Sequence, residues 1–224
     1  MMNYKAKAKD SFKTKMNLFI YDLAIQNKTE FTLDDFNKYK IEADRVGEYT
    51  TVYWQKDREH PITSQRKIDD IYHAMVDIRK RKEAMIRECE KHYVEHYFPT
   101  IFSAEKLKEF DNQDSCAYCG ITKKDIQALG EYRGLRKKHE RGWNLELDRL
   151  DSNFEYKPDN CVMCCYWCNN AKTDEFTATE FKKIGEVMHH IWQERKKLAM
   201  DRRYDERFGE PIPFTKGVMR TNKE

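Results

Sequence analysis

The sequence contains few of the residues that interrupt regular structure: its 224 residues include only 8 glycines and 5 prolines. Leu, Ile, Val and Phe together make up only about a fifth of it, near the level at which disorder is suspected. Disorder also requires a large net charge, whereas 42 basic residues nearly balance 39 acidic ones. Because aromatic residues reach 13%, we expect a folded, helix-rich protein with a thin core.

Long apolar segments are also missing. No run of 18 apolar residues occurs, which excludes a membrane-spanning helix. The polar stretch from Met1 to Lys15 lacks the apolar core of a secretory signal. We therefore expect a cytoplasmic protein in a reducing compartment, where spaced cysteines more often bind a metal than form disulfides.

The cysteines divide the chain into two parts. Cys89 stands alone in the first part, and the other six cysteines lie between Cys116 and Cys168. We expect a helical region over residues 1–100, a second domain over 101–200 and an irregular tail over 201–224.

In the first region, apolar spacing predicts helices over 11–26 and 32–39, whereas 49–54 fits either a strand or a helix. These elements could form a helix-turn-helix that reads the major groove of DNA, and a plain helical scaffold or a dimer arm fits equally well. A long helix is predicted from Ile68 to Tyr93, interrupted by Lys82. Its heptad-like seam either packs on its own domain or forms a homodimer contact, the role we assign to it. The seam consists of Ile68, Ile71, Met75, Ile78, Cys89 and Tyr93.

The second region predicts a mainly α fold with a small β-hairpin. Strands are expected over 143–148 and 160–164, and a helical turn opens at Asn169. Helices are expected over 103–110, over 122–129 with Gly130 as the end signal, and from Thr177 to Leu198, where Glu180 completes a capping box.

Two tight cysteine pairs, Cys116-x-x-Cys119 and Cys165-x-x-Cys168, predict a structural zinc site. Four thiolates can complete a tetrahedral zinc centre and leave no open position for catalysis. The alternatives are buried thiols or a redox pair at Cys116 and Cys119. Cys161-x-x-Cys164 has the same spacing, but both residues fall within the second predicted strand, so we prefer the later pair.

The stretch from Leu147 to Asn160, continued by Cys165-x-x-Cys168-Asn169-Asn170-Ala-Lys172, resembles the zinc-stapled HNH (ββα-metal) endonucleases. It is most similar to the branch of PacI-type restriction endonucleases, and the resemblance covers roughly residues 110 to 190. The family fold is a β-hairpin followed by a helix that holds one catalytic ion, usually magnesium or manganese.

The resemblance implies roles for individual residues. Asp148 and Asn169 match the two ligands of the catalytic ion, and their oxygen atoms suit magnesium. Asn160 matches the residue that ties the hairpin loop together, and Lys172 matches a basic residue that contacts phosphate.

Arg149 departs from the family pattern, because a histidine normally follows the metal-binding aspartate and acts as general base. A guanidinium keeps its proton at any workable pH, so Arg149 is expected to hold the scissile phosphate instead. Tyr156, in the hairpin loop, is the favoured base by analogy with the PacI branch. His139, or no side-chain base at all, are the alternatives.

A basic segment precedes the hairpin, and we expect it to contact DNA phosphates. Its DNA-binding residues are Arg133, Arg136, Lys137, Lys138 and Arg141.

The resemblance implies a metal-dependent endonuclease that hydrolyses double-stranded DNA, in the manner of a type II restriction enzyme from a prokaryote or a phage. We expect a homodimer, because a two-fold pair is the simplest way to cut both strands with one active centre per chain. One alternative is an HNH nuclease of low specificity from a phage-defence, toxin, phage or homing system. Another is a zinc-stabilised DNA-binding module whose nuclease site has decayed.

Overall fold

Helices dominate the chain, as its shortage of glycine and proline predicts. The computed structural model describes residues 4–55, 65–131, 135 and 142–200, and it confirms a mainly α fold with a small β-hairpin. The first part contains α1 (Tyr4–Ile25), α2 (Leu33–Lys38), α3 (Ala43–Gln55), α4 (Gln65–Arg81), α5 (Glu83–His92), a π-helical turn (Tyr93–Tyr97) and α6 (Phe98–Ile101). The second contains α7 (Ala104–Asp111), α8 (Lys123–Glu131), β1 (Glu146–Arg149), a 3-10 turn (Pro158–Asn160), β2 (Cys161–Cys164), α9 (Tyr166–Lys172) and α10 (Ala178–Met200).

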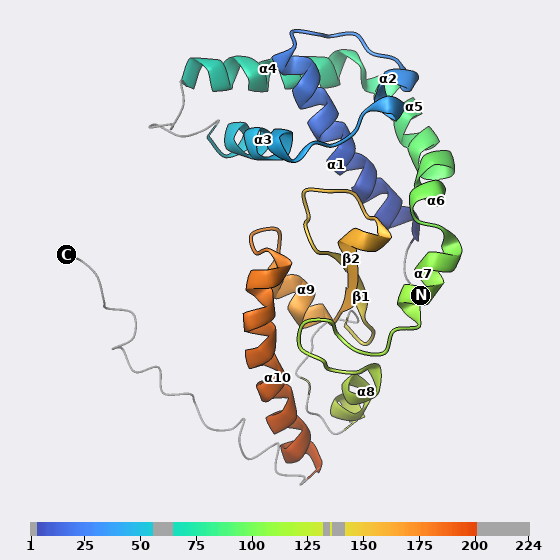
Figure 1. Ribbon diagram of the computed structural model, residues 1–224, viewed down its shortest axis with the longest axis vertical. Coiled ribbons are helices and arrows are strands. Elements are labelled where there is room, and N and C mark those ends of the chain that lie inside the picture. The colour runs from blue at the N-terminus through green and yellow to red at the C-terminus, as the bar shows by residue number, and fades with distance from the viewer. Residues whose placement is uncertain (1–3, 56–64, 132–134, 136–141, 201–224) are drawn as a thin grey trace, which may run out of the picture.

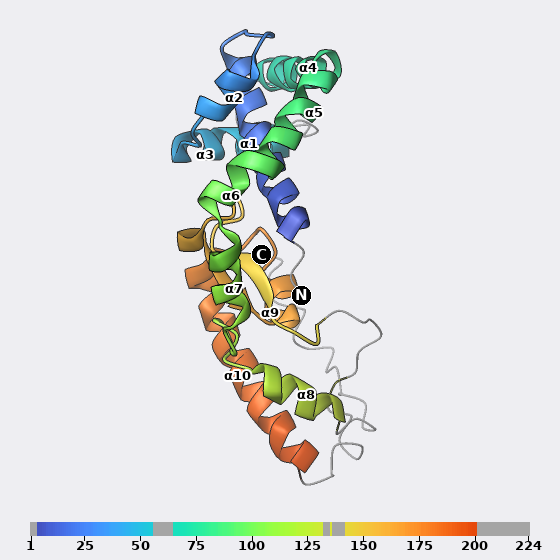
Figure 2. The same cartoon turned by 90° about the vertical axis from the view of Figure 1, so that its right-hand side faces the viewer.

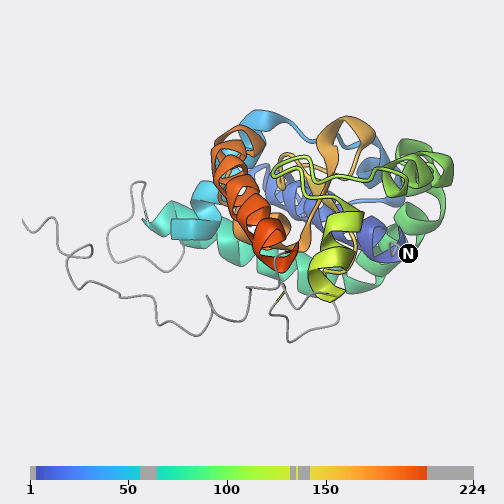
Figure 3. The same cartoon turned by 90° about the horizontal axis from the view of Figure 1, so that it is seen from below.

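These elements form an elongated molecule. Helices α1 to α6 lie at one end, the hairpin and α9 in the middle, and α8 and α10 at the other end (Figures 1 and 2). A view along the long axis shows α8 beside α10 (Figure 3). No helix in the described ranges combines the length and the apolar character needed to cross a bilayer.

Helix caps match the sequence signals closely. Thr32 and Asp35 form a reciprocal capping box at α2, and Thr177 and Glu180 form the one predicted at α10. Gly130 does not end a helix as predicted, because α8 continues to Glu131. Its role is steric instead: a Cβ atom at Gly130 would lie 2.4 Å from Cζ3 of Trp143.

The segment 49–54 is helical and belongs to α3, which packs against α1 and α4. The expected helix over 11–26 begins earlier, at Tyr4. The role of this helical region in recognising DNA stays a prediction, as does the boundary near residue 100.

The predicted dimer seam is wrong. Its helix breaks at Lys82, where the backbone has φ −107° and ψ 21°, so α4 and α5 run in different directions (Figure 1). The chain itself buries most of the seam, since Ile68, Met75, Ile78 and Tyr93 are at most 2% exposed. Most of these side chains pack on the helical core around α1, and cannot form a contact between two copies.

A polar stripe along α1, formed by Lys7, Ser11 and Thr14, attaches the helical part to the hairpin. Lys7 Nζ donates hydrogen bonds to the backbone oxygen of Leu147 at 2.9 Å and to the Tyr156 hydroxyl at 3.0 Å. Ser11 Oγ accepts a hydrogen bond from the Tyr156 backbone N–H at 3.0 Å. Thr14 Oγ1 accepts a hydrogen bond from the Arg149 guanidinium at 2.9 Å. Residues at these spacings share one helix face, so the contacts of Lys7, Ser11 and Thr14 all come from a single face of α1.

A buried network continues from this stripe. The Tyr93 hydroxyl donates to Glu155 and shares a hydrogen bond with the Ser11 hydroxyl at 3.0 Å. All three side chains are buried. Burial and the Glu155 carboxylate raise the pKa of Tyr93 above its usual value. This network joins the helix of Tyr93 to the loop that precedes β2.

We expect this network to make the protein sensitive to alkaline conditions. A tyrosine whose pKa is higher in the folded state contributes stability that is fully present below the unfolded pKa of about 10. That contribution is lost as the pH rises above this value. The free energy of unfolding should therefore fall between about pH 9 and pH 11, and fall less steeply in Tyr93→Phe. Denaturant unfolding at several pH values measures both slopes, with the exposed-site variant Tyr53→Phe as the control. Equal slopes for wild type and Tyr93→Phe would contradict this account.

A second prediction concerns the core of α4. Ile78→Ala should lower the free energy of unfolding by about 2–5 kcal/mol, because it leaves a cavity against neighbouring helices. Val76→Ala removes apolar atoms from the same helix at a position that is 43% exposed, and should change stability little. Denaturant unfolding of the two variants compares them directly. Similar losses in both would mean that this face of α4 is not part of the core.

Candidate metal-binding and catalytic site

The hairpin and α9 carry the candidate site. Strands β1 and β2 are antiparallel, with Asp148 opposite Val162 and Arg149 opposite Cys161. Two lysines cover the outer edge of β1. Lys7 Nζ donates to the backbone oxygen of Leu147 at 2.9 Å, and Lys172 Nζ donates to the backbone oxygen of Arg149, also at 2.9 Å. The short hairpin is therefore held on its free edge by side chains from α1 and α9.

Four cysteines form a buried cluster beside the hairpin. The sulfur atoms of Cys116, Cys119, Cys165 and Cys168 all lie within 4.8 Å of one another, and those of Cys119 and Cys165 are 3.7 Å apart. A tetrahedral zinc ion with Zn–S bonds of about 2.3 Å places sulfur atoms about 3.8 Å apart. The backbone N–H groups of Cys119 and Cys168 point at the sulfurs of Cys116 and Cys165. The cluster therefore fits a zinc site.

Hydrogen bonds within the cluster affect its thiols unequally. Those from the neighbouring thiols hold the pKa of Cys116 well below its usual value, whereas hydrogen bonds with Cys116 and Cys119 raise the pKa of Cys165 and Cys168. Cys161 and Cys164 lie in β2, as predicted, and are not part of the cluster. Burial raises the pKa of Cys161 to about 12, which suits an inert core thiol.

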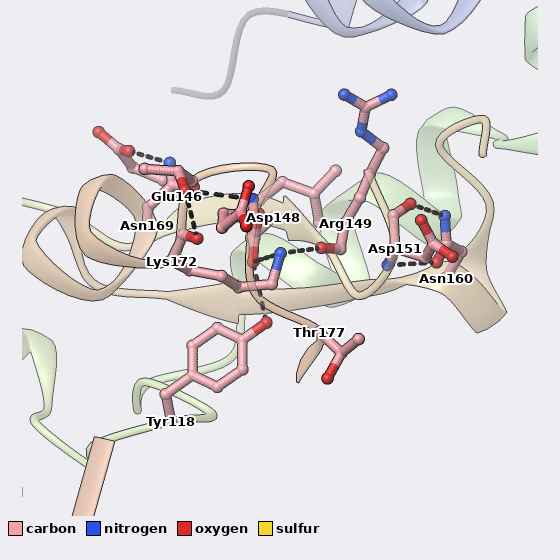
Figure 4. A network of polar contacts seen from close by, with 12 residues as sticks. Tyr118, Glu146, Asp148, Arg149, Asp151, Asn160, Asn169, Lys172 and Thr177 are labelled. Carbon is pink, nitrogen blue, oxygen red and sulfur yellow. Dashed lines mark hydrogen bonds and ion pairs between the residues drawn. The ribbon is translucent and has the colours of Figure 1, made fainter. Parts of the chain in front are cut away.

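Acidic side chains project from one face of β1. Glu146 and Asp148 are two residues apart on the strand and therefore share a face. The Tyr118 hydroxyl donates to Asp148 Oδ2 at 2.9 Å, and Lys172 Nζ forms an ion pair with the same oxygen at 3.5 Å. Figure 4 shows these groups gathered where β1 meets α9.

Asn169 extends this acidic face from α9. Its Nδ2 atom donates to Glu146 Oε2 at 2.6 Å, which leaves its Oδ1 atom as a possible ligand. Carboxylate and amide oxygens are hard donors of the type that Mg²⁺ and Mn²⁺ accept. Asp148 and Asn169, with Glu146 beside them, therefore form a donor set that fits a divalent cation.

Asn160 ties the hairpin loop together with both ends of its amide. Its Oδ1 atom accepts from the Asp151 N–H at 3.0 Å, and its Nδ2 atom donates to the backbone oxygens of Asp151 and Glu155, each at 3.0 Å. These are the loop-spanning contacts that the resemblance implies for this position.

Arg149 does not lie with Asp148. Adjacent strand residues point to opposite faces, and the Arg149 guanidinium donates to Thr14 Oγ1 at 2.9 Å and to the Phe154 oxygen at 3.1 Å. It also stacks 4.7 Å from the centre of the Tyr156 ring. Figure 4 shows the side chain directed away from Asp148. Arg149 is therefore not placed to hold the scissile phosphate as predicted. It has a structural role in the contact between the hairpin and α1.

Tyr156 also lies on the Arg149 side of the hairpin, away from Asp148. It is 6% exposed, and its hydroxyl accepts a hydrogen bond from Lys7 on the Arg149 side of the hairpin. The predicted role of Tyr156 as general base is not compatible with this position, because the hydroxyl does not face the acidic groups. Its side chain belongs to the contact between α1 and the loop.

The predicted contact of Lys172 with a DNA phosphate is also wrong. The Lys172 side chain is 1% exposed and its ammonium group contacts Asp148 and the Arg149 oxygen, so it cannot reach a DNA phosphate as predicted. The alternative base and the remaining predicted DNA-binding residues lie outside the described residues: His139, Arg133, Arg136, Lys137, Lys138 and Arg141.

Sequence reasoning missed two residues that contact this site, Tyr118 and Glu146. Tyr118 lies between the cysteines of the first pair, a position that draws attention only once the four-cysteine cluster is seen beside β1. Glu146 could have been found from strand periodicity, since it lies two residues before Asp148.

No protein-family model and no curated protein matches the chain. Among solved structures, the chain is similar to one described as the rare-cutting HNH restriction endonuclease PacI, at 30% sequence identity and a TM-score of 0.36. The match covers 42% of this chain and 66% of that chain, slightly less than two thirds of its length.

The cluster predicts the metal content of the protein. Elemental analysis should find about one zinc per chain, because four thiolates complete one tetrahedral site. Cys116→Ser and Cys168→Ser should lose the zinc and destabilise the hairpin region, because metal binding supplies folding energy. Cys161→Ser is the matched control, since Cys161 is buried nearby but outside the cluster. Loss of zinc from Cys161→Ser, with retention in Cys116→Ser, would place the metal elsewhere.

Proposed function

We propose that this protein is a metal-dependent HNH endonuclease that hydrolyses phosphodiester bonds in double-stranded DNA. The observation that carries the proposal is the combination of Asp148 on β1 and Asn169 on α9, with Asn160 bracing the loop between the strands. A four-cysteine cluster fastens the turn at Cys116–Cys119 to the start of the same helix, α9. The order of these residues along a ββα unit supports a nuclease site.

In the proposed site, Asp148 and Asn169 would hold a magnesium or manganese ion, while Glu146 fixes the amide of Asn169. Bound there, the ion would stabilise the charge on the phosphate and on the departing oxygen. The two groups that contact Asp148 are poor bases. Lys172 is an ammonium donor, and burial beside Asp148 raises the pKa of Tyr118. Neither of these two described residues is therefore suited to act as the base, and His139 lies outside the described residues. We favour attack by water without a side-chain base, so that the proton passes to solvent.

The finer proposal is a sequence-specific enzyme of the type II restriction class, acting as a homodimer. One active centre per chain cuts one strand, so two copies related by a two-fold axis are the simplest way to cut both strands. The contact between copies must lie away from the buried α4–α5 seam. A nuclease of low specificity would give heterogeneous ends on mixed DNA, whereas a restriction enzyme gives defined ones. Sequencing the product ends separates these two outcomes.

The proposed site predicts a specific loss of activity. Asp148→Ala and Asn169→Ala should abolish magnesium-dependent nicking of a plasmid, because each removes a ligand of the catalytic ion. Asn170→Ala is the matched control: Asn170 neighbours Asn169 on α9 but is exposed, and its side-chain amide donates to the Tyr166 backbone oxygen. Zinc content, measured in parallel, should stay the same in all three variants.

Two results would contradict the proposal. Nicking by Asn169→Ala at the wild-type rate would place the active site elsewhere. A wild-type protein that binds DNA but does not cleave it with magnesium or manganese would instead be a zinc-stabilised DNA-binding module.

A further inference from the structure

The Asp148 carboxylate is buried and is held by two side chains. It is only 9% exposed, and two donors from different elements meet the same oxygen, Oδ2. The Tyr118 hydroxyl lies 2.9 Å away and the Lys172 ammonium 3.5 Å away, and both side chains are themselves buried. A carboxylate has two oxygens able to accept. With Oδ2 engaged twice, Oδ1 is the oxygen able to bind an ion.

Tyr118 reaches Asp148 from the four-cysteine cluster. It lies between Cys116 and Cys119, the first pair of sulfur ligands. The neighbouring Ala117 N–H donates to the Met163 oxygen of β2 at 2.9 Å, which fixes this turn on the hairpin. Any rearrangement of the turn therefore moves the phenol relative to Asp148.

Helix α10 holds Tyr118 from behind. The Tyr118 ring contacts Phe181 edge-on, with ring centres 5.2 Å apart. A Cβ atom at Gly185 would lie 2.5 Å from the Tyr118 backbone oxygen, so only glycine allows α10 to approach this closely. The Tyr118 hydroxyl is thus aimed at Asp148 by the cysteine turn on one side and by α10 on the other.

We propose that Tyr118 is a positioning residue that holds Asp148 as a one-oxygen ligand and makes binding of the catalytic ion depend on the integrity of the zinc cluster. This inference rests on the proposed function, because it assumes that Asp148 binds the ion. Lys172 supplies the second constraint on Oδ2 and neutralises part of the buried charge. Groups that orient a metal ligand in this way commonly change metal affinity by about 10- to 100-fold when they are removed.

The test measures ion binding directly, with Mn²⁺ as the probe and the zinc-loaded full chain as the protein. Free Mn²⁺ is counted by electron paramagnetic resonance during a titration. Tyr118→Phe keeps the ring that packs on Phe181 and removes only the hydroxyl, so it should fold and retain zinc. We expect its Kd for Mn²⁺ to rise by about tenfold or more. The exposed-site variant Tyr53→Phe should bind Mn²⁺ as wild type does.

A remote variant tests the same geometry without touching the hydroxyl. Gly185→Ala pushes α10 against the Tyr118 backbone and should weaken Mn²⁺ binding, while adding little to Tyr118→Phe when the two are combined. Raising Mn²⁺ to saturation should restore most of the nicking rate of Tyr118→Phe, since a positioning defect lowers affinity rather than removing the ligand. A purely structural defect would not be rescued by Mn²⁺.

The outcomes separate the inference from the proposed function. If Asp148→Ala abolishes Mn²⁺ binding and Tyr118→Phe binds Mn²⁺ like wild type, the inference is overturned and the proposed ion site stands. If wild type and Asp148→Ala bind Mn²⁺ equally, Asp148 is not an ion ligand and both fail. Weaker binding in Tyr118→Phe with unchanged zinc content supports the inference.

Discussion

The arrangement of the site depends on the four buried cysteine sulfurs more than on any other contact. They join two segments that are distant in the chain, the turn at Cys116–Cys119 and the start of α9 at Cys165–Cys168. Through that joint, Tyr118 reaches Asp148 and α9 lies against β1. The two four-residue strands supply few backbone hydrogen bonds of their own, and a two-stranded hairpin is only marginally stable in water. A metal in the cluster would supply the folding energy that such a small sheet lacks.

A second constraint explains the structural role of Arg149, which departs from the pattern of the endonucleases that the motifs resemble. The two faces of β1 serve different purposes, since Glu146 and Asp148 face α9 and Arg149 faces α1. Arg149, Tyr156 and the α1 stripe form one connected contact of hydrogen bonds and a stacked guanidinium. An arginine suits this position because its planar, permanently charged group can donate to two oxygens while stacking on a ring. The helical part is thereby fixed to the hairpin through the residue next to the proposed metal ligand.

Features governed by local sequence could be predicted, and features governed by tertiary contacts could not. The capping boxes at Thr32 and Thr177 depend on neighbours three residues away, so their signals are complete in the sequence. The choice of Cys165 over Cys161 followed from the strand that contains Cys161. The direction of Arg149 and the burial of Tyr156 depend on α1, which is far away in the chain, and no local pattern encodes that contact. Gly130 depends on a tertiary contact in the same way, because it lies against the ring of Trp143 and not at a helix end.

The position of Cys168 directly before Asn169 has a consequence for the order in which the protein matures during synthesis. The last sulfur ligand and the proposed last ligand of the catalytic ion leave the ribosome as consecutive residues. Helix α10, which supports Tyr118, follows them. A nascent chain that ends before this point has neither centre complete, and cannot hold the ion in the proposed way. Under the proposed function, a chain released before Asn169 therefore lacks the means to cut the DNA of the cell that makes it.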